Sequence, residues 1–212
     1  VKEIDQIGFT IFDKKDQQLD TLKALSNQIF KKNKPIALLR DDDYSRALLA
    51  QAFIGKNKSV NPFYKIQNNF YDTLDRHVFL SKIQLIRKNI IFDDTLLNNI
   101  RIVQDKLDLD KLQKLFNHFD FFTDSKNPIS LDQTLDSSNL NITNLQLTKL
   151  QIIRALIAEP EILIIDSYLD GINPKTAQML ITKILTFKKD LIFIVITGSK
   201  TISNLMPTYL EF

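Results

Sequence analysis

Acidic residues follow two of the most apolar segments of the sequence. Asp166 ends the apolar run 161–166, and an aspartate triplet at 41–43 comes shortly after the run 35–39. An acid at the carboxyl end of a buried strand commonly takes part in ligand chemistry in α/β sheets, and magnesium prefers carboxylate oxygens. Asp166 is therefore a candidate magnesium ligand, with a purely structural role as the alternative.

The residues after Leu39 have the spacing of a phosphate-binding loop but not its residue types. In the motif G-x-x-x-x-G-K-[ST], backbone N–H groups and a helix N-terminus bind phosphates, the lysine reaches the outer phosphates, and the hydroxyl ligates magnesium. Arg40 and Ser45 stand at the two glycine positions. Arg46 stands at the lysine position and Ala47 at the hydroxyl position. The phosphate-contacting residue types are therefore replaced throughout this segment.

Three aspartates fill the middle of this loop. Asp41, Asp42 and Asp43 stand where nucleotide phosphates would lie, and their carboxylates would repel them. A helix N-terminus is stabilised by negative charge, by roughly 0.3–1 kcal/mol at exposed sites, and these aspartates supply that charge from within the chain. We therefore expect the helix start to be stable without a bound phosphate. The simpler interpretation, that the aspartates only favour the start of a helix, leads to the same expectation.

Composition excludes several other kinds of site. The chain has 212 residues, a net charge of +3, four glycines and no cysteine. Glycine-rich phosphate loops are disfavoured, because an average protein of this length would hold about 15 glycines. Without cysteine there are no disulfides, thiolate nucleophiles or cysteine zinc sites, and the charge surplus is too small to indicate nucleic-acid binding. No apolar run approaches the roughly 18–20 residues that span a bilayer, and the segment 1–5 lacks the pattern of a signal peptide.

The elements that must position these residues alternate between strands and helices. Apolar patterns predict a turn over 13–20 and strands over 7–12, 22–30, 35–39, 161–166 and 191–197. Helical spacing predicts one helix from Ala47 to Ile54, stopped by Gly55, and another that opens at Asn173-Pro174. This order indicates an α/β fold, in which N-terminal antiparallel strands precede a parallel sheet between helices.

A helical subdomain is predicted inside this α/β core. Apolar residues recur at helical spacing from about Asp93 to Ser125, and a long helix is expected from about Thr143 to Ala158, after a polar stretch. The chain is therefore expected to be one domain, with 1–92 and 159–212 in the core and about 93–158 in the subdomain.

Several segments resemble the ABC transporter ATPases, in the right order and at the right spacings. The segment 159–176 resembles their Walker B and D-loop pattern, D-P-x-I-L-I-L-D-E-x-T-S-A-L-D-x-x-T. Residues 142–146 stand in the place of the L-S-G-G-Q signature, and 149–156 is similar to the helix after it. Residues 91–100 resemble the segment after the Q-loop of exporter-type members, and 127–140 has the length and position of their X-loop. The resemblance implies a P-loop NTPase-like nucleotide-binding domain of an exporter, of the type I secretion kind.

The resemblance also identifies the family's catalytic positions in this chain. Ser167 stands at the position of the catalytic glutamate and Gly198 at that of the switch histidine, while Asp166 keeps the Walker B carboxylate. The Q-loop glutamine falls on Arg87, or on Gln84 in a shifted register. A serine hydroxyl cannot take a proton from water near neutral pH without a base of its own. The resemblance therefore implies that no catalytic residue is intact.

Other nucleotide-contacting positions are altered as well. The family's adenine-stacking aromatic falls on Ile11, beside Phe12. The last four signature positions, S-G-G-Q in the family, are held by Thr143, Asn144, Leu145 and Gln146. Both signature glycines are therefore lost. Because phosphoryl transfer needs magnesium, lysine and water-orienting groups together, these replacements predict a degenerate nucleotide-binding domain, a pseudo-ATPase. No cofactor is expected to bind tightly, and weak binding of ATP and magnesium is the alternative.

The resemblance implies a setting and partners. The domain would support the transmembrane domain of an ABC exporter, in the same or another chain, and form a homo- or heterodimer with another nucleotide-binding domain, without nucleic acid. It would lie in the cytoplasm at the inner face of the cell membrane. The aromatic cluster is predicted to be core packing, or else a groove for a coupling helix of the membrane domain: Phe116, Phe119, Phe121 and Phe122.

Two other functions remain open. One is a working ATP-binding subunit that drives transport with a catalytic partner. The other is a non-transport interaction module that uses the same fold for protein contacts. The start of the chain, within a strand-like stretch, fits an excised domain of a longer exporter slightly better than a separate subunit.

Overall fold

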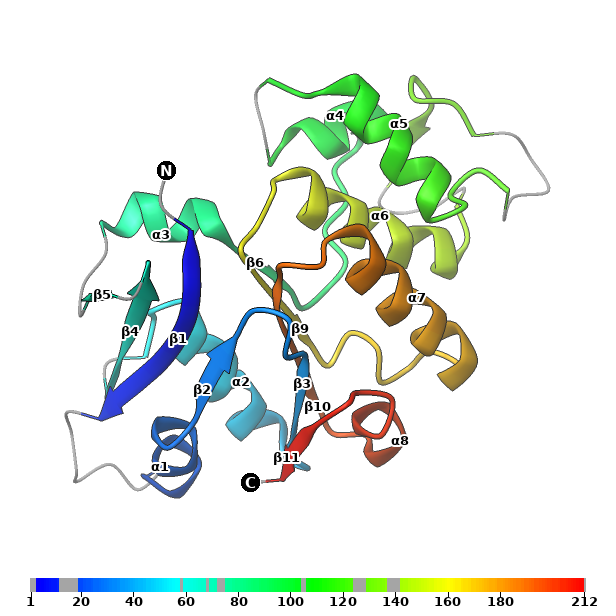
Figure 1. Cartoon of the computed structure of the whole chain (residues 1–212). Coiled ribbons are helices and arrows are strands. Elements are labelled where there is room, and N and C mark those ends of the chain that lie inside the picture. The colour runs from blue at the N-terminus through cyan, green and yellow to red at the C-terminus, as the bar shows by residue number, and fades with distance from the viewer. Residues whose placement is uncertain are drawn as a thin grey trace. The chain divides into compact units, whose positions relative to one another are not determined.

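The structure is a computed structural model that describes residues 3–11, 19–57, 59–67, 69–71, 75–103, 106–123, 129–136 and 142–211. The chain forms two compact units (Figure 1). Unit 1 comprises 1–87, 160–179 and 188–212, and unit 2 comprises 88–159 and 180–187. The division expected from the sequence, with a helical subdomain over about 93–158, stays a prediction.

A five-stranded parallel sheet forms the centre of unit 1. Its spatial order is β11 (Tyr209–Glu211), β3 (Ile36–Leu39), β10 (Ile192–Thr197), β9 (Ile162–Asp166) and β6 (Ile83–Ile86). β9 and β10 are buried along their whole length. Strands covered on both faces have continuous apolar sequences, which explains the isoleucine-rich runs. The strands predicted over 35–39, 161–166 and 191–197 are confirmed.

An antiparallel sheet of four strands forms the second layer of unit 1. Its order is β2 (Ile29–Lys31), β1 (Ile4–Ile11), β4 (Val60–Ile66) and β5 (Asn69–Tyr71), which confirms the predicted N-terminal antiparallel strands. Gly8 pairs with Phe63 across β1 and β4. A Cβ atom at Gly8 would lie 2.3 Å from Cζ of the Phe63 ring. The glycine is therefore needed because the aromatic ring lies directly on its backbone.

One predicted strand is wrong over most of its length. Residues 22–26, expected in a strand over 22–30, belong instead to helix α1 (Leu19–Ser26), and only the end of the predicted segment is extended, in β2. Leu22 and Leu25 lie three residues apart, on one helical face, and both are fully buried. In a strand these two side chains would point to opposite faces, whereas the helix buries both on one side. Residues 13–18 of the predicted turn lie outside the described residues.

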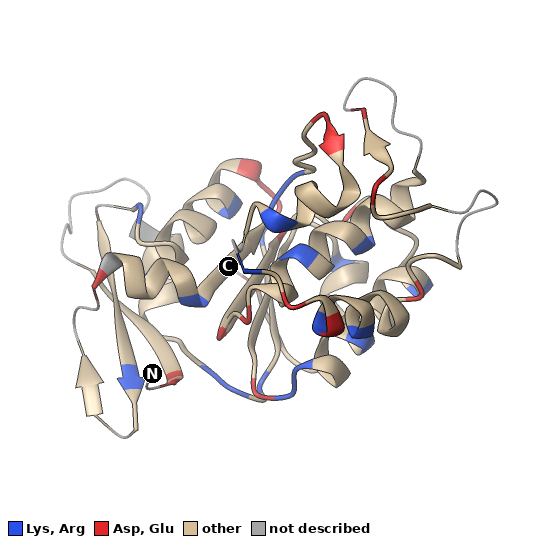
Figure 2. Ribbon diagram, turned by 90° about the horizontal axis from the view of Figure 1, so that it is seen from above, with Lys and Arg blue, Asp and Glu red and all other residues tan. Residues whose placement is uncertain are grey.

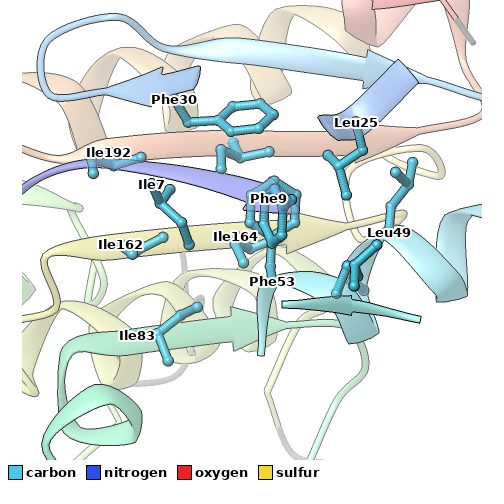
Figure 3. Packing of buried hydrophobic residues seen from close by; sticks show 14 of the residues in the cluster. Ile7, Phe9, Leu25, Phe30, Leu49, Phe53, Ile83, Ile162, Ile164 and Ile192 are labelled. Atoms are coloured by element: carbon cyan, nitrogen blue, oxygen red, sulfur yellow. The ribbon is translucent and has the colours of Figure 1, made fainter. Parts of the chain in front are cut away.

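The hydrophobic core of unit 1 lies between β1, the parallel sheet and helix α2 (Asp43–Phe53) (Figure 3). The side chains of Ile7 and Phe9 from β1 face Ile162 and Ile164 from β9. The rings of Phe9, Phe30 and Phe53 pack edge to face, with centroids 4.9–6.3 Å apart. This packing fixes α2 against the sheet and thereby fixes the loop that leads into α2.

The helices that contain residues of unit 1 begin and end at identifiable signals; one of them, α7, starts in unit 1 and continues over 180–187 in unit 2. α2 ends as predicted before Gly55, which has a φ of +66°, a conformation that favours glycine. α7 (Pro174–Phe187) opens as predicted, because the Asn173 side chain accepts a hydrogen bond of 3.0 Å from Lys175 N. The two other helices are short: α3 (Arg76–Lys82) and α8 (Lys200–Ser203).

Unit 2 is mainly helical, as predicted for the middle of the chain. It contains α4 (Leu96–Arg101), α5 (Leu109–His118), α6 (Asn144–Ile157) and a short pairing of β7 (Asp94–Thr95) with β8 (Thr134–Leu135). The core interpretation of the aromatic cluster is confirmed for three rings, which are at most 1% exposed: Phe116, Phe119 and Phe121. Of the predicted X-loop, 127–140, residues 127–128 and 137–140 lie outside the described residues.

Charged residues are distributed over both units. Figure 2 shows Lys and Arg interspersed with Asp and Glu along the described ribbon, in keeping with the net charge of +3. Among the described residues, no helix is both long and apolar enough to cross a bilayer.

Candidate functional site at the carboxyl edge of the parallel sheet

The carboxyl ends of β3, β10 and β9 bring most of the predicted site positions together (Figure 1). Arg40, the first residue after β3, donates its backbone N–H to Thr197 O at 2.9 Å. Ser167, the first residue after β9, donates its N–H to Ile196 O at 2.8 Å. Gly198 follows β10. Segments more than 100 residues apart in sequence therefore meet at one edge of the sheet, where α/β folds bind ligands.

The start of α2 is satisfied by its own side chains. Asp42 is the N-cap and accepts a hydrogen bond of 2.7 Å from Ser45 N. The other carboxylate oxygen of Asp42 pairs with Arg40 Nε at 2.9 Å. The hydrogen bond from the Ser45 backbone, followed by the Ser45 hydroxyl and by Arg40, holds the pKa of Asp42 below its usual range. The backbone N–H of Ser45, which a phosphate loop would offer to its ligand, therefore already has an acceptor in Asp42.

The side chain of Arg46, which the sequence places at the lysine position of the phosphate-loop motif, turns toward the loop 40–43 and contacts it. Its Nη1 donates to the carbonyl oxygens of Arg40 and Asp41, the latter at 2.8 Å. Its Nη2 pairs with the Asp43 carboxylate, and its Nε donates to Ser167 Oγ at 3.0 Å. The side chain is only 10% exposed. We call these contacts the Arg46 clasp.

Gly198 makes room for the clasp. A Cβ atom at this position would lie 2.5 Å from Nη1 and 3.1 Å from Cζ of Arg46. The guanidinium therefore rests on the Gly198 backbone, and any larger residue at position 198 would displace it. The residues at 46, 167 and 198 are consequently not independent, because Arg46 contacts the residues at both other positions.

Asp166 is enclosed by polar partners. It is 1% exposed, and its Oδ1 accepts a hydrogen bond of 3.0 Å from Ser167 Oγ. Arg87 Nε lies 3.1 Å from Oδ2, close enough for an ion pair, although no described residue donates an aligned hydrogen bond to that oxygen. Burial raises the pKa of Asp166, against the opposing effects of Ser167, Arg87 and Arg46.

The residues at this edge do not fit a magnesium–nucleotide complex. Among the described residues, no group of three or more His, Asp and Glu side chains could hold a metal ion. A cavity of about 260 Å³ beside the loop is lined by Leu39, Arg40, Asp41, Asp42 and Glu211, so acidic residues outnumber the one basic residue there. Carboxylates repel phosphates, and the loop carbonyls that face Arg46 cannot donate to a phosphate oxygen. The contacts match a bound cation, which the chain supplies as Arg46.

Asp170 belongs to the same edge and was not identified from the sequence. Its carboxylate accepts hydrogen bonds from the Thr197 hydroxyl and, at 2.9 Å, from Gly198 N. It thereby ties the turn after β9 to the end of β10. An acid four residues after Asp166 was the available signal, but only the paired strand ends show its partners.

The remaining positions that the sequence analysis singled out in unit 1 have the following places in the structure. Arg87 contacts Asp166, whereas Gln84 lies within β6, opposite Leu163 of β9. Ile11 is the last residue of β1 and is half-buried, and Phe12 lies outside the described residues. Ala47 lies in α2 just after its first turn and is partly buried.

The signature positions lie in unit 2, at the start of α6. Thr143 is the N-cap: its hydroxyl accepts from Gln146 N at 3.1 Å, and Gln146 Oε1 accepts from Thr143 N at 2.9 Å. This is a capping box. Gln146 is fully buried and also donates to Phe121 O at 3.4 Å. Asn144 is exposed and Leu145 is half-buried.

Comparison with known proteins supports the fold. The chain is similar to the solved structure of a bacterial Atm1-family ABC exporter with ATP bound, with a TM-score of 0.77 over 100% of this chain. The chain has an ABC-related fold. The sequence identity is 13%, so the similarity concerns the fold alone.

The ABC-related fold covers only part of that exporter. The chain spans 38% of the length of the exporter chain. No protein-family model and no curated protein matches the sequence. The residues at the carboxyl edge must therefore be interpreted from their own contacts.

Proposed function

We propose that the chain is a degenerate nucleotide-binding domain of an ABC exporter that neither binds Mg-ATP tightly nor hydrolyses it. In this proposal it has a structural or regulatory role beside a transmembrane domain or a second nucleotide-binding domain, at the cytoplasmic face of a membrane. The ABC-related fold and the order of the resembling segments support the exporter setting. The type I secretion kind and the dimer rest on the sequence resemblance alone.

The Arg46 clasp is the observation that supports the proposed loss of nucleotide binding. The guanidinium uses the carbonyls of Arg40 and Asp41 and the hydroxyl of Ser167, so the polar groups of the loop satisfy one another. Polar groups that are already paired gain little from a new partner, because the old hydrogen bond must be broken first. A nucleotide would have to displace Arg46 and then face the carboxylates of Asp42 and Asp43.

Hydrolysis is disfavoured by a second set of contacts. Ser167 Oγ accepts from Arg46 Nε and donates to Asp166 Oδ1, so both interactions of the hydroxyl are made within the site, and a hydroxyl is a much weaker base toward water than a carboxylate. Without a group that orients or activates water, an in-line attack on a phosphate lacks its nucleophile. A catalytic partner could not replace these groups, because they lie within unit 1 of this chain.

Titration calorimetry of the chain with millimolar Mg-ATP tests the proposal. The Asp166→Asn variant is the matched control, since it removes the candidate magnesium ligand and nearly preserves side-chain volume. We expect no binding heat from either protein. Micromolar binding to the parent chain that is lost in the variant would overturn the proposal and favour a working ATP-binding subunit.

A further inference from the structure

We propose that the Arg46 clasp makes three strand-end segments of unit 1 open and close as one cooperative unit that is held closed without any ligand. The segments are the loop 40–45 after β3, the turn at Ser167 after β9 and the turn at Gly198 after β10. The inference deepens the proposed function, on which it rests for the assignment of these segments to nucleotide contact. Arg46 then acts as an internal ligand, a cation attached to the chain itself.

The geometry of one guanidinium carries this coupling. Its donors lie in a single plane at fixed angles, and here they reach acceptors on residues 40, 41, 43 and 167 at the same time. The planar group also rests on Gly198. Because the donors cannot move separately, displacement of one segment shifts the guanidinium away from the other two.

Direct backbone contacts strengthen the same connection. Arg40 N donates to Thr197 O, Ser167 N to Ile196 O, and Gly198 N to the Asp170 carboxylate. Each segment is therefore bonded to a neighbouring strand end or turn as well as to the clasp. A cooperative opening would expose several of these amides together.

Amide hydrogen exchange on the whole chain, without nucleotide, tests the coupling. The reporters are the backbone amides of Arg40, Ser45, Ser167 and Gly198. In Arg46→Met, which keeps an unbranched chain of similar reach without the guanidinium, we expect all four to exchange faster by an order of magnitude or more. The amides of α6 in unit 2 are expected to keep their parent rates.

A second pair of variants tests the clasp with Arg46 in place. Gly198→Ala puts a Cβ atom 2.5 Å from Nη1 of Arg46 and so displaces the guanidinium. Gly171→Ala is the matched control, since nothing lies within 4 Å of a Cβ there. Faster exchange at Arg40, Ser45 and Ser167 is expected in Gly198→Ala and not in Gly171→Ala.

The outcomes separate this inference from the proposed function. Faster exchange confined to Arg40 and Ser45 in Arg46→Met, with Ser167 and Gly198 unchanged, would overturn the cooperative clasp. Equal rates in the two glycine variants would also overturn it. The calorimetric titration fails or succeeds independently, because a chain that binds Mg-ATP can still have a cooperative clasp, and a chain that binds none can lack one.

Discussion

Two helix starts stand where the resemblance to ABC ATPases places phosphate-contacting segments, and each is satisfied in a different way. The start of α2 is held by charges, through Asp42, Asp43, Arg40 and Arg46. The start of α6 is held by neutral, reciprocal hydrogen bonds between Thr143 and Gln146. The N-terminal N–H groups of a helix require acceptors, and in both places the chain provides some of them.

The two helix starts differ in how many distant residues take part in them. The capping box at α6 is a local arrangement within four residues. The α2 start extends through Arg46 and Ser167 to Asp166 and Arg87, and so joins distant strand ends. Loss of a single residue should therefore be felt widely at α2 and only locally at α6.

The largest expected effect is that of Arg46→Met. The change removes the guanidinium hydrogen bonds to the carbonyls of Arg40 and Asp41 and to the Ser167 hydroxyl, and hydrogen bonds to charged groups contribute about 1.5–3 kcal/mol. We expect the free energy of unfolding to fall by roughly 2–4 kcal/mol in urea denaturation.

Arg87→Met is the control on the same edge. The Arg87 side chain is 49% exposed whereas that of Asp166 is 2% exposed, so solvent screens the pair in part, and Ser167 still bonds Asp166 in the variant; we expect a smaller loss than in Arg46→Met. If Arg46→Met and Arg87→Met lowered the free energy of unfolding by equal, small amounts, Arg46 would not be the main stabilising residue of this edge.

A smaller and local effect is expected at α6. Thr143→Ala removes the hydroxyl that accepts from Gln146 N, and the loss of an N-cap costs about 0.5–2 kcal/mol. Thr143→Ser keeps the hydroxyl and should retain most of the stability. Because the box is neutral, added salt should leave the Thr143→Ala loss unchanged. A loss that varies strongly with salt would show that charges act at this helix start too.

The pH dependence of Asp166→Asn gives the next measurement. Burial raises the pKa of Asp166, so the folded state binds its proton more tightly than the unfolded state. The stability from this group is then present at low pH and is lost as the pH rises from the ordinary carboxyl pKa through the raised one. Asp166→Asn should therefore gain stability relative to the parent as the pH rises across this window. A flat difference in denaturation midpoints would contradict the pKa shift.

Asp42→Asn should show the opposite slope and the smallest effect. The pKa of Asp42 is lowered, chiefly by the Ser45 hydrogen bond, so its stability is present above the ordinary carboxyl pKa and is lost as the pH falls through the lowered one. Asparagine caps helices about as well as aspartate, so little change is expected at neutral pH. On acidification the variant should lose less stability than the parent. If the stability difference from the parent changed with pH in the same direction for Asp42→Asn and Asp166→Asn, the opposite pKa shifts of the two residues would be refuted.

The sequence predicts the parts of the fold that local pattern controls. Continuous apolar runs predict β3, β9 and β10, the cap Asn173 predicts the start of α7, and helical spacing predicts α6 from about Thr143. Helix α1 is missed because the polar and apolar residues of 22–30 are interpreted as alternating. The three-residue spacing of Leu22 and Leu25 fits a helix instead, and both side chains are buried on one helical face.

The candidate site could be predicted as a set of positions but not as a network. The replacements at 46, 167 and 198 are visible in the sequence, yet the bond from Arg46 to Ser167 crosses 121 residues. No spacing rule gives the direction of the Arg46 side chain or the room that Gly198 leaves for it. The partners of Asp170 and Arg87 likewise depend on which strands are neighbours.

The most direct test of the central claim, that this edge is saturated by its own polar groups, is the melting temperature of the parent chain with and without millimolar Mg-ATP. A ligand at 100 times its Kd adds about 2.7 kcal/mol, which raises the melting temperature of a chain of this size by roughly 5–10 °C. The account predicts no shift. A rise of several degrees would contradict it, because it would mean that nucleotide displaces Arg46 and the loop rearranges around phosphate.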